Sequence, residues 1–188
     1  MHIAPDLGRG KKGETVSDSQ GGKRRWEGRE DLTGEHALTD IGQLVLALLF
    51  AGTWIADSFF LHVTTFLNET IHPAIRVPIA AILLAVSGYL GWSSHRIIFG
   101  ETRREPHVVR NGVFSVVRHP MYLSEILLYL GLLLLSVSLM AAGVWLAAIG
   151  FLHAIARTEE RLLAVRFGDE YTTYARDVGM WFPRPRKR

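Results

Sequence analysis

Long apolar stretches alternate with charged ones along this chain. Between Ile41 and Val63 only Asp57 is charged, and between Val77 and His95 no residue is. Between Met121 and Ala156 the only charged residue is Glu125. Because about 20 consecutive apolar residues cross the hydrocarbon core of a bilayer, these stretches predict membrane-spanning helices rather than the core helices of a soluble protein.

The pattern predicts an all-α polytopic membrane protein with four transmembrane helices. The first covers about Asp40 to Leu61, the second about Ile75 to Ile98 and the third about Met121 to Val137. The fourth begins near Leu139 and continues past Ala156. One helix through both of the last stretches would be too long for a core of ~30 Å, so we expect a tight turn at Ser136 to Ser138.

The distribution of Lys and Arg predicts how these helices are oriented. Seven of the 21 basic residues precede the first span and five lie between the second and third spans. Eight more lie from Arg157 onward, at the end of the fourth span and after it. Only Arg76 lies between the first and second spans. Since cytosolic loops carry the excess of Lys and Arg, both termini are expected in the cytosol (N-in/C-in).

Residues 1–39 differ in composition from the rest. They are polar and rich in glycine, with little periodicity, and include the basic run Lys23, Arg24 and Arg25. This composition predicts a disordered cytosolic arm, and contact with anionic lipid is the alternative. The remainder, residues 40–188, is expected to form one membrane domain.

Composition narrows the chemistry. The chain has no cysteine, which excludes disulfides and any zinc or redox site built on thiolates. The pI near 9.4 accompanies a net charge of only +3, so we attribute the basic residues to membrane topology and expect no nucleic-acid partner. No metal-ligand spacing is evident, and no metal is expected.

Polar groups gather before the third span and after the fourth. Pro120 is suited to the first turn of a helix, whose free N–H groups would face the cytosol and favour an anionic ligand group. The fourth helix has no stop signal at the membrane boundary and should continue to Gly168, a C-terminal cap. Asp169 is then expected to cap a short helix that carries Tyr171 and Tyr174.

On the extended fourth helix, His153, Arg157 and Glu160 share one face, because they are spaced i, i+4 and i+7. Glu159 lies about 100° away, so the two carboxylates should have different partners. These residues predict a polar, cytosol-facing site and a C-terminal helical extension outside the membrane.

Two motifs make this prediction more specific. The first is Val109-x-x-Gly112-x-Phe114-x-x-Val117-Arg118-His119-Pro120-x-Tyr122, and the second, about 35 residues later, is Arg157-x-Glu159-Glu160-x-x-Leu163-x-x-x-Phe167-Gly168-x-Glu170-Tyr171-x-x-Tyr174. Together they resemble the isoprenylcysteine carboxyl methyltransferase family and the related phospholipid methyltransferases. The resemblance covers residues 108–183, which would be the cofactor-binding half.

The resemblance implies methyl transfer from S-adenosyl-L-methionine to a lipophilic acceptor in the bilayer, by an integral multi-pass membrane enzyme (in the cell membrane if prokaryotic). Its cofactor-binding residues would be Gly112, Val113, Phe114, Arg118, His119, Tyr122, Glu159 and Glu160. Its catalytic residues would be Arg157, Glu159 and Glu125. A carboxylate acceptor could be steered by Arg157, whereas an amine would need a base such as Glu125 or His119.

Alternatives stay open at this stage. A nicotinamide-dependent membrane reductase of the same architecture is one, although paired glutamates disfavour a phosphate-bearing cofactor. A non-enzymatic lipid-binding membrane protein is another. Arg118 could be only an interfacial cation, and Asp57 could be functional or simply lie near the far interface. Membrane lipids are expected partners; the acceptor and the oligomeric state are not predicted.

Overall fold

A computed structural model describes residues 36–100 and 107–184, with side-chain surroundings from residue 40 onward. Contacts divide the chain into Met1–Leu38 and Thr39–Arg188, and the second unit holds nearly all of the described structure. Its elements are helical: α2 (His36–Ile55), η2 (Ala56–Leu61), α3 (Leu67–Thr70), α4 (Pro73–Gly100), η3 (Gly112–Ser115), α5 (Pro120–Leu135), α6 (Leu139–Phe167) and α7 (Asp169–Asp177).

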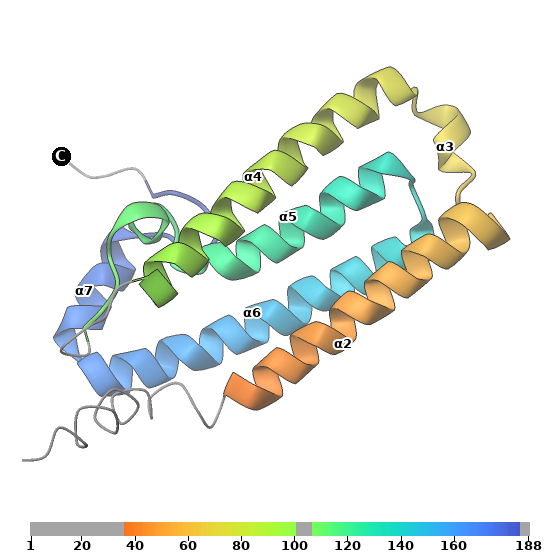
Figure 1. The fold of residues 1–188 in the computed structure, drawn as a ribbon. Helices are drawn as coiled ribbons and strands as arrows, with labels where there is room; N and C mark the ends of the chain where they lie inside the picture. The colour runs from red at the N-terminus through yellow and green to blue at the C-terminus, as the bar shows by residue number, and fades with distance from the viewer. Residues whose placement is uncertain (1–35, 101–106, 185–188) are drawn as a thin grey trace, which may run out of the picture. The chain divides into compact units, whose positions relative to one another are not determined.

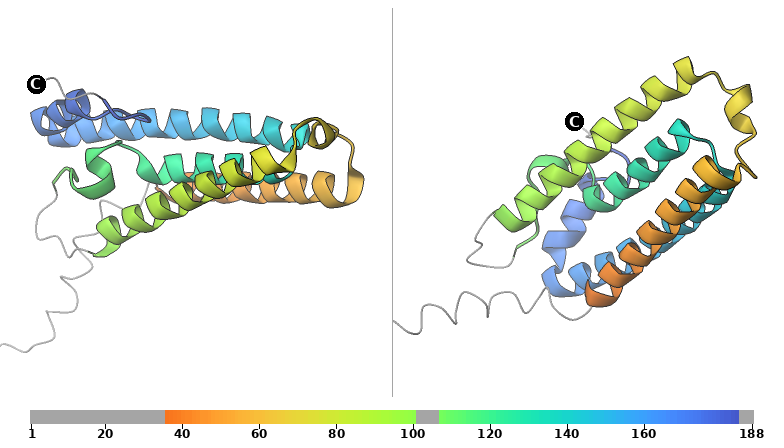
Figure 2. Two further views of the ribbon diagram at one scale, coloured as in Figure 1. Left: turned by 90° about the horizontal axis from the view of Figure 1, so that it is seen from above. Right: turned by 45° about the vertical axis from the view of Figure 1, so that its right-hand side comes forward.

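Within the second unit the long helices run alongside one another (Figure 1). Helix α5 lies between α4 and α6, and its most extensive packing is along α4. Both views in Figure 2 place α7 and the loop that contains η3 at one end of the helices, with α3 at the other. Segments on either side of the α5–α6 hairpin therefore meet at a single end.

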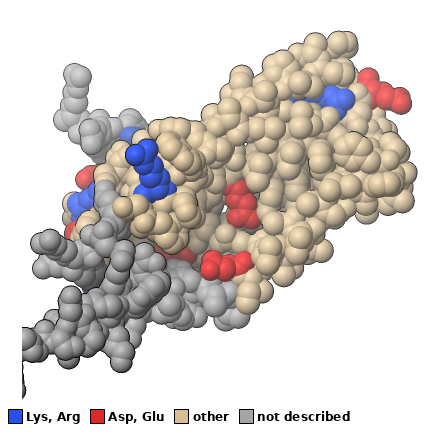
Figure 3. Space-filling view, in the orientation of Figure 1, with Lys and Arg blue, Asp and Glu red and all other residues tan. Residues whose placement is uncertain are grey.

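Three helical stretches are long and apolar enough to cross a membrane: Asp40–Leu61, Pro73–Gly100 and Leu139–Phe167. Large apolar side chains such as Leu48, Ile82 and Leu146 are exposed, as lipid contact requires. Charged side chains are sparse along the middle of the face in Figure 3. The predicted all-α class is thus confirmed for the described residues, and three of the four predicted spans correspond to helices long and apolar enough to cross a membrane.

Helix α5 is apolar but shorter. Its 16 residues correspond to about 24 Å at 1.5 Å per residue, less than the ~30 Å hydrocarbon core. It joins α6 through Ser136 to Ser138, so the predicted tight turn is present. Whether α5 crosses the membrane as a fourth span remains a proposal.

The N-terminal arm lies mostly outside the described residues, since nothing before His36 is described. Residues 36–39, assigned to the arm from sequence, are instead the first residues of α2.

Asp57, in the π-helical turn η2, connects the loop after η2 to the start of α6, at the end of the helices opposite to the two motifs. It is buried and accepts hydrogen bonds from Ser138 Oγ at 2.5 Å and from the backbone N–H of Val63 at 2.9 Å and Thr64 at 3.1 Å. The Thr64 hydroxyl also donates to it. A carboxylate with this many donors stabilises the loop after α2, which favours the structural alternative for Asp57.

At the motif end, α6 continues to Phe167 and stops at Gly168, whose N–H donates to the carbonyl of Ala164. The expected cap at Gly168 is confirmed, with a positive φ of 54°. The expected cap at Asp169 is wrong: Asp169 is the first residue of α7, Gly168 occupies the N-cap position, and no side chain caps this helix. A single residue therefore ends one helix and begins the next, which leaves no room for a separate cap.

A small core fixes α7 against the end of α6. Val108, Tyr171 and Tyr174 are buried together and pack against Leu163 and Phe167, among other residues. Tyr171 and Tyr174 of α7 are thus packed in a small core of their own, and Val108 joins the loop before η3 to the same core.

Candidate functional site

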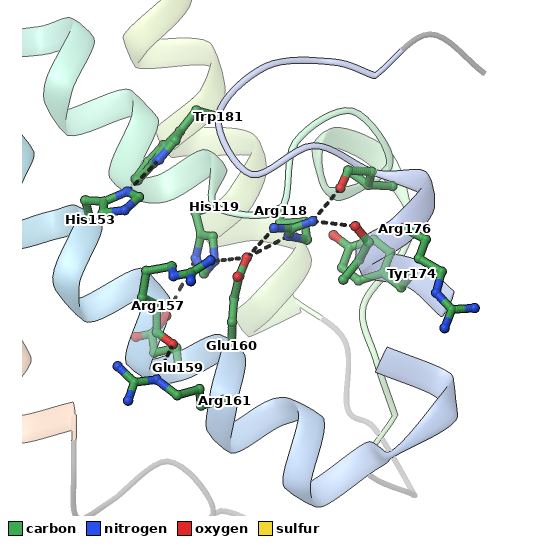
Figure 4. A network of polar contacts seen from close by, with 12 residues as sticks. Arg118, His119, His153, Arg157, Glu159, Glu160, Arg161, Tyr174, Arg176 and Trp181 are labelled. Atoms are coloured by element: carbon green, nitrogen blue, oxygen red, sulfur yellow. Dashed lines mark hydrogen bonds and ion pairs between the residues drawn. The ribbon is translucent and has the colours of Figure 1, made fainter. Parts of the chain in front are cut away.

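The start of α5 sets the position of the first motif. Pro120 occupies the first turn of the helix and His119 is its N-cap residue. Proline fits here because the first N–H groups of a helix have no partner within it. The His119 backbone, at φ −120° and ψ 63°, turns its buried imidazole toward α6 (Figure 4).

Tyr122 and Glu159 bring the two motifs into direct contact. The Tyr122 hydroxyl donates a hydrogen bond to Glu159 Oε1, joining the first turn of α5 to the end of α6. The Tyr122 ring also stacks on His119, with centroids 5.6 Å apart and planes 5° apart. The structure therefore brings together the segments that the sequence motifs single out.

His119 lies between the two carboxylates. Its Nδ1 is 3.7 Å from Glu159 Oε2, and its Nε2 is 3.4 Å from Glu160 Oε1. Nε2 is buried and completes no hydrogen bond of good geometry within the described residues. A buried ring nitrogen in this condition is available to a bound polar group.

Glu160 is bound to Arg118 instead. The guanidinium Nη2 lies 2.6 Å from Glu160 Oε1, and Nε donates to the same oxygen at 2.7 Å. The side chains are only 9% and 14% exposed, so this pair is largely desolvated. As helical spacing predicts, Glu159 and Glu160 accept hydrogen bonds from different residues, Tyr122 and Arg118, while His119 lies near both.

Arg118 also holds the segment after α7, residues 178–184, which we call the C-terminal strap. Its Nη1 donates to the carbonyl oxygens of Ala175 at 2.6 Å and Val178 at 2.7 Å. Its backbone N–H donates to the carbonyl oxygen of Gly179 at 2.9 Å, and Val117 and Gly179 form an isolated parallel β-bridge. Arg118 is thus fully engaged within the protein, which favours a structural role over direct cofactor contact.

The turn Gly112–Ser115 forms the loop before α5. Gly112 has φ +56°, a conformation that favours glycine, and a Cβ there would also require the Ile97 side chain, 2.6 Å away, to shift. Phe114 is buried, and its carbonyl accepts a hydrogen bond from Tyr174 at 2.7 Å. Burial raises the pKa of Tyr174 to about 12, against the opposing effect of Arg118, so its hydroxyl stays protonated and can donate.

Arg157 is exposed, and its guanidinium forms no hydrogen bond or ion pair with the described residues. In Figure 4 its side chain extends from α6 toward His119. A cation beside the cluster that is not already paired can bind an anionic group.

Glu125 is one turn further along α5 and apart from the cluster. It accepts a hydrogen bond from Tyr129 at 2.6 Å, and Tyr129 stacks on Phe50 of α2 with centroids 4.3 Å apart. The structure therefore does not bring Glu125 into contact with Glu159 or Glu160.

An apolar groove of about 420 Å³ adjoins the cluster, between α4, the η3 loop, α5 and the strap. It is lined by Tyr89, Leu90, Gly112, Val113, Val116, Val117, Leu123, Leu127, Trp181, Phe182 and Pro183. Of the predicted cofactor residues, Gly112 and Val113 line this groove, whereas the carboxylates do not. The end of the helices thus offers a charged side and an apolar side.

Sequence reasoning missed the contact between Trp181 and His153. The indole N–H donates to His153 Nδ1 at 3.2 Å, and the rings are 6.2 Å apart. The residues are 28 positions apart and lie on a loop and a helix, so no periodicity connects them. The available signals were His153 on the face shared with Glu160 and the Trp-Phe-Pro sequence after α7.

Comparison with known proteins gives a family and two relatives. The family model described as phospholipid methyltransferase (PEMT) matches residues 71–170. The cobalt-zinc-cadmium resistance protein CzcN of Cupriavidus metallidurans is 34% identical over 109 residues, which cover 54% of this chain and 50% of CzcN. The nickel-cobalt-cadmium resistance protein NccN of Alcaligenes xylosoxydans xylosoxydans is 30% identical over 113 residues, which cover 56% of this chain and 52% of NccN.

The chain spans about half the length of the curated relatives it matches. No solved structure matches it. The family match contains α4, α5 and α6, and with them Arg118, His119, Tyr122, Glu159 and Glu160.

Proposed function

The chain belongs to the phospholipid methyltransferase family, and from that premise we propose that it transfers a methyl group from S-adenosyl-L-methionine to a lipophilic acceptor in the membrane. The observation that carries the proposal is the contact between Tyr122 and Glu159, which joins the two motifs at one site.

The residues present fit this cofactor. S-adenosyl-L-methionine supplies a methyl group on a positively charged sulfur. Glu159 is 23% exposed and its Oε2 accepts no hydrogen bond in the described structure, so it is suited to bind the cofactor ammonium. Arg157, exposed and unpaired among the described residues, is suited to the cofactor carboxylate, and His119 Nε2, which lies 3.4 Å from Glu160 without completing a hydrogen bond, provides one further polar contact.

We assign different roles to the two glutamates. Glu160 is already paired with Arg118 and keeps the strap in place through it. Glu159 accepts a hydrogen bond from the Tyr122 hydroxyl through Oε1, and its Oε2, 3.7 Å from His119 Nδ1, can accept another donor. We therefore propose Glu159 as the residue that binds the cofactor amine, and Glu160 and Arg118 as positioning residues.

The apolar groove supports a lipophilic acceptor. It reaches from the lipid-exposed surface of α4, where Tyr89 is 60% exposed, to Trp181 beside His119. Its volume of about 420 Å³ is within the usual range of ligand pockets. An acceptor with an isoprenoid or acyl chain would find apolar walls next to the charged cluster.

Orientation is what these residues contribute to the reaction. Methyl transfer is an in-line displacement, and correct alignment of reacting groups supplies about 7–11 kcal/mol in well-oriented systems. The apolar walls of the groove would reduce the water around a bound acceptor, and a drier site strengthens electrostatic interactions. If the methyl acceptor is a carboxylate, no base is needed. An amine must lose a proton, and Glu125 is the proposed base that takes this proton.

We propose that the site faces the cytosol. Twenty of the 21 Lys and Arg residues lie on one side if α5 crosses the membrane as a fourth span, and that side contains both motifs. Soluble cofactor would then arrive from the cytosol and the acceptor from the bilayer.

The names of the two relatives favour a second candidate function, a contribution to resistance against cobalt, zinc, nickel or cadmium. The two functions are compatible if methylation of a membrane component confers tolerance. Expression in a metal-sensitive bacterium tests this: wild-type protein should improve growth in cadmium, and Glu159→Gln should not.

Transfer of a labelled methyl group tests the main proposal. Purified protein is incubated with labelled S-adenosyl-L-methionine and either phosphatidylethanolamine vesicles, a prenylated cysteine or a total lipid extract. We expect label in an apolar product with wild-type protein and none with Glu159→Gln. Binding of reduced nicotinamide cofactor without binding of S-adenosylhomocysteine would instead support the reductase alternative.

A further inference from the structure

Trp181 belongs to both sides of the site. It lines the apolar groove next to Phe182 and Pro183. Its ring is also 6.0 Å from the ring of His119, at an angle of 42°, and so borders the cluster of His119 with the two glutamates. Figure 4 shows the indole above this cluster, at the edge of the strap.

The strap holds Trp181 between two fixed points. Before it, Gly179 is buried and bound to the Arg118 backbone. After it, the Arg184 guanidinium donates to the carbonyl oxygens of Arg176 at 2.9 Å and Ala175 at 3.2 Å. A Cβ on Gly179 would lie 1.8 Å from the Phe182 carbonyl oxygen, so the strap folds tightly back on itself around Trp181.

His153 fixes the direction of the indole. The indole N–H is a donor only, and it donates to His153 Nδ1, which must be unprotonated to accept. His153 lies one turn of α6 before Arg157 and is exposed apart from this contact. Trp181 as a whole is partly buried, whereas its hydrogen bond to His153 is exposed, so this bond fixes the direction of the ring.

We propose that Trp181 is a specificity-determining wall at the border where the cofactor side and the acceptor side of the site meet, and that His153 is the positioning residue that fixes this wall. The inference rests on the proposed function and deepens it. The indole face is suited to a cationic sulfonium on one side, because aromatic rings attract cations, and to a hydrocarbon chain on the other.

Two pairs of variants separate this role from simple packing. His153→Phe keeps an aromatic ring but removes the acceptor of the indole N–H, whereas His153→Gln offers an amide oxygen in its place. Trp181→Phe keeps an aromatic wall without the donor. Trp145→Phe is the matched control, because the Trp145 indole, near the start of α6, also donates a hydrogen bond, to the Ile126 carbonyl at 3.1 Å, but lies away from the site.

Fluorescence provides a measurement that needs no acceptor. The contribution of Trp181 is the difference in emission between wild-type protein and Trp181→Phe. We expect S-adenosylhomocysteine to change the emission of Trp181. The size of this change should differ in His153→Phe and should be the same in Trp145→Phe as in wild-type protein. If wild-type protein binds S-adenosylhomocysteine and the Trp181 emission stays the same, the inference is wrong while the proposed function stands.

Kinetics then test specificity with whichever probe, phosphatidylethanolamine vesicles or prenylated cysteine, wild-type protein methylates. We expect His153→Phe to raise the acceptor KM about tenfold, while its affinity for S-adenosylhomocysteine stays within twofold of the wild-type value. In His153→Gln the acceptor KM should return nearly to the wild-type value. The double variant His153→Phe/Trp181→Phe should be no worse than Trp181→Phe, because the partners act together. Additive losses, or an unchanged KM in His153→Phe, would overturn the inference; absence of S-adenosylhomocysteine binding by wild-type protein would instead refute the proposed function.

Discussion

Glu159 and Glu160 are adjacent in the sequence but contact different partners. One helical step of about 100° directs Glu159 to Tyr122 and Glu160 to Arg118. The sequence predicted this separation, since it follows from helical geometry alone. It could not predict which glutamate is paired with Arg118, because the two residues of that pair are 42 positions apart and meet only in the folded chain.

Substitution by glutamine distinguishes the two roles. Glu159→Gln keeps an oxygen for the Tyr122 hydroxyl but loses the charge that would bind the cofactor amine. We expect S-adenosylhomocysteine affinity to fall at least about tenfold, since hydrogen bonds to charged groups contribute roughly 1.5–3 kcal/mol. Calorimetric titration measures this, and Tm should remain close to that of the wild type.

Glu160→Gln should have the opposite effects, with a larger change in Tm than in cofactor affinity. It leaves the Arg118 cation, 9% exposed, without its counter-charge. Breaking such a pair costs about 3 kcal/mol or more, so we expect a clearly lower Tm in detergent solution. Equal effects of the two substitutions on Tm and on affinity would contradict the separate roles.

Glu125 provides a test of the acceptor class. It lies outside the groove lining and is bound to Tyr129, so its catalytic role stays a prediction from the sequence. With phosphatidylethanolamine as the acceptor, loss of a base should lower kcat in Glu125→Gln about 100-fold. An unchanged kcat with this amine would remove Glu125 from the proposed catalytic residues.

At the scale of elements, the C-terminal strap connects α7 to the start of α5. The sequence predicted the helices well because apolar periodicity and glycine caps act locally. The strap depends on contacts 57 to 60 residues apart, such as those of Arg118 with Ala175 and Val178, which no local pattern encodes. The wrong expectation at Asp169 has a similar cause, since Gly168 already occupies the N-cap position.

Gly179→Ala tests the importance of the strap. The added Cβ would lie 1.8 Å from the Phe182 carbonyl oxygen, so the strap would have to shift. Because misplacement by 1 Å can reduce rates about 100-fold, we expect a large loss of methyl transfer with little change in helix content.

Gly143→Ala is the matched control for this substitution. A Cβ at Gly143, within α6, would meet nothing within 4 Å. Its methyl transfer should equal that of the wild type. Full activity in Gly179→Ala would show that the strap does not position the site.

At the scale of the whole molecule, the proposed orientation has both motifs in the cytosol. Hydropathy predicts the three long helices directly, whereas the 16-residue α5 is shorter than they are. Because α5 is short, its assignment as the fourth span depends on the distribution of basic residues.

Cysteine labelling tests this orientation directly, because the chain contains no cysteine. We expect a membrane-impermeant maleimide applied to intact cells to label His72→Cys, which precedes α4 and is exposed. It should label Ser115→Cys, exposed in the η3 loop, only after the cells are opened. Labelling of both positions from outside would exclude a site that faces the cytosol.

The central claim is that the start of α5 and the end of α6 form one binding site for the methyl donor. The most direct test is calorimetric titration of purified wild-type protein, Tyr122→Phe, Glu159→Gln and Trp145→Phe with S-adenosylhomocysteine. We predict one site per chain, weakened by substitution on either helix and unchanged in Trp145→Phe. An affinity that neither Tyr122→Phe nor Glu159→Gln alters would contradict the claim.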